Sequence, residues 1–161
     1  MQTEFPNLKV TIYADSVNDL DRMTSILQGV GKVDVLVPNA GVSHAYAPSK
    51  DIPLPELQNT FDVNVISTFH LIKEFLALNT SGPRTIIYTS SCLAYFYIPG
   101  SMGYNGSKAA ANLMIQHFAN DCADAGVTAQ VFHPGAINTE SARDAFGEDA
   151  LDWEDRKSTF P

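Results

Sequence analysis

The hydrophobic and polar positions of this chain alternate between short apolar runs and longer segments with helical spacing. Four runs are rich in β-branched residues and have the length of strands. They cover residues 8–14, 33–37, 84–89 and 127–132. The run at 33–37 reads VDVLV without full alternation, which is typical of a strand that is covered on both faces.

Three segments between these runs repeat apolar residues at the spacing of a helix, over residues 19–31, 55–78 and 104–125. The first of them opens with acidic residues, which suit the positive end of a helix dipole. Strands and helices therefore alternate along the chain. This order predicts an α/β fold, with a parallel sheet of about four strands and helices on both faces.

Composition and charge narrow the classes of function. The chain has 161 residues, the size of one domain, and 45% of them are hydrophobic, so we expect a packed core. Its formal net charge of −8 argues against nucleic acid or an anionic membrane surface as a partner. No apolar run approaches the roughly 18 residues of a membrane span. Cys92 and Cys122 have no second cysteine at metal-ligand spacing, so we expect reduced thiols in a cytoplasmic protein and no metal site.

The stretch 84–111 carries the strongest chemical signal. Ser91 follows the end of a strand, and Tyr104 and Lys108 lie four residues apart in the helix that comes next. That spacing puts a phenol and an ammonium on one helical face. A nearby ammonium lowers the pKa of a phenol from its ordinary value of about 10, and a serine hydroxyl can hold the oxygen of a carbonyl or alcohol beside it. The pattern predicts general acid/base chemistry, although a Tyr-x-x-x-Lys pair alone is more often an ordinary surface pair.

The stretch SSCLAYFYIPGSMGYNGSK resembles the short-chain dehydrogenases/reductases, and the similarity runs from about residue 8 to about residue 140. The resemblance implies that Ser91 positions the substrate oxygen and that Tyr104 donates or accepts the proton. Lys108 would lower the pKa of Tyr104 and hold the nicotinamide ribose. Asn64 is unusual inside a helix, because its side chain competes with backbone hydrogen bonds. In the family it is the fourth catalytic residue, which anchors a water that links the lysine to bulk solvent.

The same resemblance implies an NAD or NADP site at the ends of the strands. The sequence Asn39-Ala40-Gly41 would let the backbone pass close to the cofactor, since glycine has no Cβ. Further cofactor contacts are implied for Asp15, Tyr104, Lys108, Pro134, Gly135, Ile137 and Thr139.

The implied substrate is a small carbonyl or alcohol compound. Three aromatic residues at 95–97 follow Ser91 and indicate either an apolar or ring-containing substrate or side-chain packing. The apolar stripe of the helix 104–125 predicts either core or a dimer face, and we expect a homo-oligomer. His44 and His133 have no third partner for a metal or base site, and we interpret them as loop or core residues.

The chain departs from the family's pattern at both ends. It contains no G-x-x-x-G-x-G turn to receive a pyrophosphate, and the helix and strand expected after Thr139 are missing. We therefore expect a truncated Rossmann-like fold, with a catalytic portion at 1–140 and a polar acidic tail at 141–161. Nicotinamide cofactor should bind weakly or not at all. Besides an NAD(P)-dependent oxidoreductase, two functions stay open: a cofactor-independent isomerase, dehydratase or cyclase, and a non-catalytic interaction subunit.

The same departure leaves one strand without its usual neighbours. In a complete family member two strands separate the segment 8–14 from 33–37. A bare β-branched edge invites association with other chains, and the helical connection between the two segments is long enough for direct pairing. Two outcomes would cover the edge: 8–14 pairs directly with 33–37, or two chains share or swap these strands in a symmetric dimer. We expect the direct pairing, which gives a four-stranded sheet in sequence order.

Overall fold

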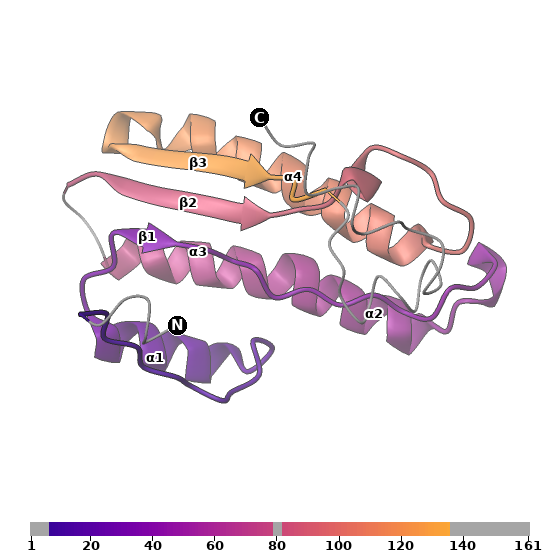
Figure 1. Cartoon of the computed structure of the whole chain (residues 1–161), viewed down its shortest axis with the longest axis horizontal. Coiled ribbons are helices and arrows are strands. Elements are labelled where there is room, and N and C mark those ends of the chain that lie inside the picture. Colours follow the sequence, from indigo (N-terminus) through magenta and orange to yellow (C-terminus); the bar gives the residue numbers. More distant parts are fainter. Residues whose placement is uncertain (1–6, 79–81, 136–161) are drawn as a thin grey trace.

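The computed structural model describes residues 7–78 and 82–135 (Figure 1). Its sheet has three parallel strands in the order β1-β2-β3. The predicted α/β class and the parallel sheet are confirmed, with three strands in place of about four. The elements in chain order are α1 (Leu20–Val30), β1 (Val35–Leu36), α2 (Leu54–Phe61), α3 (Ser67–Leu78), β2 (Arg84–Thr89), α4 (Met102–Asp121) and β3 (Val127–Phe132). Short 3-10 turns occupy Ser49–Asp51, Cys92–Ala94 and Ala123–Ala125, and a π-helical turn, Asp62–Ile66, joins α2 to α3.

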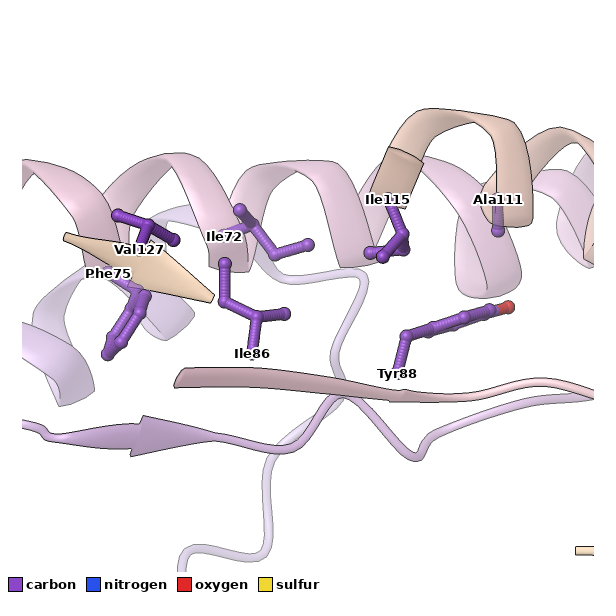
Figure 2. Close-up of a cluster of buried hydrophobic side chains, with 7 residues drawn as sticks. All are labelled: Ile72, Phe75, Ile86, Tyr88, Ala111, Ile115 and Val127. Carbon is purple, nitrogen blue, oxygen red and sulfur yellow. The ribbon is translucent and has the colours of Figure 1, made fainter. Parts of the chain in front are cut away.

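Both helical connections of the sheet lie on the same face. The chain passes from β1 to β2 to β3 in one direction, and right-handed crossovers then put α3 and α4 on a common side. Figure 2 shows side chains of both helices above β2, on which Ile86 and Tyr88 are fully buried. The buried cluster consists of Ile72, Phe75, Ile86, Tyr88, Ala111, Ile115 and Val127.

The opposite face of the sheet is open in the part of the chain that the structure describes. Val35 and Phe132, which alternate with core-facing residues of β1 and β3, are 51% and 50% exposed. Among the described residues the helices therefore cover one face, where the sequence led us to expect two. The reason is topological, because no connection in residues 7–135 runs in the opposite direction across the sheet.

The segment 8–14 is not a strand, so its predicted pairing with 33–37 is wrong. The structure assigns no strand to residues 7–14, and Ile12 is 85% exposed. The helix that follows is docked on α3, where His70 Nε2 lies 2.8 Å from Thr24 Oγ1 and 3.0 Å from Leu20 O. Figure 1 shows the indigo chain along the outer side of α1, away from β1. Because α1 is docked on α3, the segment 8–14 lies away from the sheet. A β-branched composition does not make a strand without a neighbouring strand to pair with.

Candidate active site

Asn64 lies at the centre of a buried hydrogen-bond network beside the sheet. Its side chain is fully buried. The amide Nδ2 donates to Val42 O and to Ser107 Oγ, both at 2.8 Å, and Oδ1 accepts from Val42 N at 2.9 Å. Asn64 therefore ties the loop that follows β1 to helix α4.

The π-helical turn Asp62–Ile66 explains how a helix accommodates this asparagine. Within and just after the turn, side-chain hydroxyls satisfy backbone carbonyls: Ser67 Oγ donates to Val63 O at 2.6 Å, and Thr68 Oγ1 donates to Asn64 O at 3.2 Å. Single π-turns inside α-helices frequently occur at functional sites. The sequence pattern predicts one continuous helix over 55–78, and only the oddity of Asn64 hints at the turn.

Ser91 and Tyr104 meet at the carboxyl end of β2. Ser91 follows the strand in an extended conformation, and its Oγ accepts from Leu93 N at 3.2 Å. The phenol of Tyr104, in the first turn of α4, lies close enough to the Ser91 side chain for Ser91 to lower its pKa. Burial has the larger effect and raises the pKa of Tyr104, so the net shift is upward from 10.0. The Tyr104 phenol is therefore protonated at neutral pH.

Lys108 is buried one turn after Tyr104, with 3% of its surface exposed. Its Nζ donates to Thr89 O at 2.9 Å and lies 4.9 Å from the ring centre of Tyr88 and 5.8 Å from that of Tyr104. Burial lowers the pKa of Lys108 to about 8. The lowered pKa that the resemblance implies for Tyr104 is not found here, because loss of hydration of the phenolate outweighs the other influences on that phenol.

Gly41 packs directly against the two buried polar side chains. A Cβ at this position would lie 3.3 Å from Lys108 Nζ and 3.4 Å from Asn64 Oδ1. The sequence predicts that Gly41 lies where the backbone approaches another group closely. In this structure the groups that come close are the side chains of Lys108 and Asn64. Asn39 and Ala40, which precede it, are exposed after β1.

The remaining residues implied for a cofactor site lie, where the structure describes them, at two places. Asp15 precedes α1 and forms an ion pair with Arg22 at 3.2 Å. Pro134 and Gly135 follow β3, and Gly135 has a φ of 75°, which favours glycine. The predictions for Ile137 and Thr139, and for the acidic tail, lie outside the described residues.

Ser107 is a site residue whose role the sequence pattern does not reveal. It is fully buried, accepts from Asn64 Nδ2, and donates to Tyr104 O at 2.8 Å. The sequence indicates only a small residue that allows close packing. The sequence offers one sign that Ser107 belongs to the site: it directly precedes Lys108, so its hydroxyl lies on the same helix as the phenol and the ammonium.

The donor set of this cluster fits the ribose and nicotinamide end of a dinucleotide. An ammonium has three N–H donors, and Thr89 O is the acceptor that the described residues give to Lys108. Its remaining donors suit the hydroxyls of a ribose. Within residues 7–78 and 82–135, no three His, Cys, Asp or Glu side chains gather as for a metal ion, and no helix is long and apolar enough to cross a membrane. The arrangement is therefore suited to moving a proton to or from an oxygen held by Ser91.

Comparisons with known proteins point in one direction. The family model described as short chain dehydrogenase matches residues 4–150. The short chain dehydrogenase/reductase AacuD of Aspergillus aculeatus is 41% identical over 155 residues, which cover 96% of this chain and 55% of that protein. The chain spans about half the length of the curated relatives it matches.

Solved structures give the same fold. A protein described as an NAD(P)-dependent gluconate 5-dehydrogenase from Beutenbergia cavernae, with bound NADP at low occupancy, has a TM-score of 0.83 at 22% identity and covers 92% of this chain and 61% of its own. A short chain dehydrogenase from Burkholderia cenocepacia J2315 in complex with NADP has a TM-score of 0.76 at 25% identity, with 84% of this chain and 58% of its own covered. These likenesses confirm the predicted Rossmann-like class.

Proposed function

Because this chain belongs to the short-chain dehydrogenase family, we propose that it acts as an NAD(P)-dependent oxidoreductase that interconverts a carbonyl and an alcohol on a small molecule. One observation carries the proposal: the Tyr104 phenol lies close enough to Ser91 for that side chain to lower its pKa, one helical turn before the buried Lys108. A proton donor, a hydroxyl to hold the reacting oxygen and a cation are the groups that such a reaction needs.

Each side chain has a role in this proposal. Ser91 holds the substrate oxygen, and Tyr104 gives its proton to that oxygen in reduction and takes it back in oxidation. The Tyr104 phenol is protonated at neutral pH, which is the state that reduction needs. Lys108 would hold the ribose hydroxyls, and Asn64 fixes the loop beside it. The bound nicotinamide would supply the hydride for reduction.

The aromatic residues after Ser91 support a ring-containing substrate. Tyr95, Phe96 and Tyr97 are 63%, 65% and 85% exposed, which is unusual for side chains of this size in one loop. Asn105 Nδ2 donates to Phe96 O at 2.7 Å and so fixes the loop to the helix that carries Tyr104. Exposed rings in a loop that is bonded to the helix of Tyr104 suit a planar aromatic ketone better than a highly hydroxylated sugar.

An apolar groove on the outer side of α3 and α4 supports the predicted homo-oligomer. Its volume is about 500 Å³, and it is lined by Phe69, Ala110, Leu113, Met114, His117, Phe118 and Asp121. Leu113 is 58% exposed and Phe69 is 45% exposed, so a second chain would cover apolar surface here. Light scattering of the purified chain measures this directly.

The function is tested by incubating the full chain with NADPH or NADH and a panel of aromatic and aliphatic ketones, and following nicotinamide absorbance. We expect consumption of the reduced cofactor with ring-containing ketones, and its loss in the Tyr104→Phe variant. Turnover that is equal in the parent chain and in Tyr104→Phe would overturn the proposal.

A further inference from the structure

His44 is a buried side chain in the loop between β1 and α2, with 6% of its surface exposed. Its Nδ1 lies 2.6 Å from Ala45 O, and its Nε2 lies 3.0 Å from Gly103 N. A carbonyl oxygen only accepts a hydrogen bond, and a backbone N–H only donates one. Both contacts are therefore satisfied by a neutral ring with its proton on Nδ1 and an acceptor at Nε2.

The partner of Nε2 is an otherwise uncapped group. The N–H of Gly103 is among the first four of α4, which have no acceptor within the helix. Ser101, at the N-cap position, makes no side-chain cap bond, and its Oγ donates to Ile98 O at 2.8 Å instead. His44 thus caps α4 from 59 residues away in the sequence.

The contact is also sterically specific. A Cβ on Gly103 would lie 2.5 Å from His44 Cδ2 and 2.9 Å from Leu57 Cδ1, so a side chain there would displace the ring. The loop that carries His44 is tied on its other side to Asn64 through Val42. One short loop therefore grips both the network around Asn64 and the first turn of α4.

We propose that His44 is a positioning residue, which fixes the phenol of Tyr104 against Ser91 by capping the preceding residue, Gly103. This inference rests on the proposed function, in which Tyr104 moves the proton. Loss of the cap frees the first turn of α4, lets water reach the phenol, and takes Tyr104 out of its reactive orientation.

The test compares three variants of the full chain. His44→Phe keeps a ring of similar volume but removes both hydrogen bonds, whereas His44→Gln keeps an acceptor close to the Nε2 position. Gln116→Phe, at an exposed position of α4 that does not line the apolar groove, is the control. The first readouts need no substrate: amide exchange of Gly103 by NMR, and titration of the Tyr104 phenol by absorbance, with the Tyr104→Phe counterpart of each variant subtracted.

We expect Gly103 to exchange at least about tenfold faster in His44→Phe. The pKa of Tyr104 should move down toward 10, with partial recovery in His44→Gln and no change in Gln116→Phe. In turnover, kcat for ketone reduction should fall about tenfold or more, with the KM for the nicotinamide cofactor unchanged. Unchanged Gly103 exchange and an unchanged phenol titration in both His44 variants would overturn the inference. If those two readouts shift but no ketone is reduced by the parent chain, the cap is real and the proposed function fails.

Discussion

The carboxyl end of the sheet and its β1 edge differ in how many of their hydrogen-bonding partners come from the described part of the chain. At the carboxyl end, Asn64, Ser107 and Lys108 are all buried and hydrogen-bonded to groups of this chain. At the edge, β1 has two residues and pairs with β2 alone among the described strands, and the segment 8–14 stays outside the sheet. The difference teaches that the proposed proton-transfer cluster is held by β2, the turn Asp62–Ile66, α4 and the loop after β1, and that none of its described contacts involves a strand beyond β1.

The strongest test of this separation is the Tyr104→Phe change. It removes one hydroxyl from the cluster and keeps the ring, so the fold should persist. General acid/base groups typically contribute about 10²–10⁴-fold to a rate, and we expect a loss of that size in ketone reduction. Tyr13→Phe is the matched control, because Tyr13 is 46% exposed and lies in the segment 8–14, away from the cluster. Equal losses in both variants would show that the effect does not depend on the Tyr104 hydroxyl.

Cofactor affinity tests the incomplete side of the comparison. The described cluster offers donors for the ribose end, whereas the sequence has no Gly-rich turn to give N–H donors to a pyrophosphate. A net charge of −8 adds no attraction for a dinucleotide. We therefore expect fluorescence titration with NADPH or NADH to give a dissociation constant above about 100 μM, which lies in the upper part of the range that Michaelis constants usually cover. Low micromolar binding would contradict this and would require phosphate contacts from another segment.

Lys108→Met should stabilise the fold while it ends activity. The lysine is charged at neutral pH although burial lowers its pKa to about 8, from 10.5. Replacing it with an apolar side chain of similar length removes this cost, which corresponds to a few kcal/mol of unfolding free energy. Urea unfolding at pH 7 measures the gain, and Lys73→Met, at an exposed position of α3, serves as the control. A destabilised Lys108→Met would mean that the bond to Thr89 O outweighs desolvation.

The same lysine predicts the pH dependence of stability. Between about pH 8 and the ordinary lysine pKa of about 10.4, the unfolded chain binds more protons at this position than the folded chain does. Its contribution to the free energy of unfolding therefore rises with pH across that window. We expect the difference in stability between Lys108→Met and the parent to shrink from pH 7 to pH 10. A constant difference would show that Lys108 keeps an ordinary pKa when folded.

The smallest effects should distinguish an isoleucine in β2 from one in the segment 8–14. Ile86→Val removes a methylene from a fully buried side chain and should lower the free energy of unfolding by about 0.5–1.5 kcal/mol. Ile12→Val, at a position that is 85% exposed, should change stability by less than about 0.5 kcal/mol. Chemical denaturation of both variants checks this, and an equal cost at Ile12 would indicate that 8–14 is buried in the protein in solution.

The sequence predicted the helices, whose apolar residues recur on one face that packs against the core. The prediction failed for the segment 8–14, where strand formation depends on a neighbouring strand. The helical spacing over 55–78 and 104–125 corresponds to α2, α3 and α4, because those positions face the core. The run 8–14 has the same β-branched composition as β2, but a strand also needs a neighbour with free hydrogen-bonding groups. Composition carries no information on that neighbour.

The candidate site shows the same limit. Ser91, Tyr104 and Lys108 lie within eighteen residues of one another, so their spacing in one strand, loop and helix could be interpreted directly. The partners of Asn64 and His44 are Val42, Ser107 and Gly103, at separations of 22, 43 and 59 residues. Those contacts depend on how the loop after β1 packs against α4, which no local pattern encodes.

The π-helical turn Asp62–Ile66 constrains the number of residues in the helical segment that runs from α2 to α3. Such a turn holds one residue more than an α-helical turn, and each residue of an α-helix advances the side chains by about 100°. On one side of it α2 contacts α4, and on the other side α3 buries Ile72 and Phe75 against the sheet. The turn therefore sets the phase between two docked halves of one helix. Deleting a single residue there would restore an α-helical turn and keep the two halves in phase, but it would remove the wider turn that holds Asn64. Deleting a residue from α2 or α3 would instead rotate one half by about 100° against its neighbours.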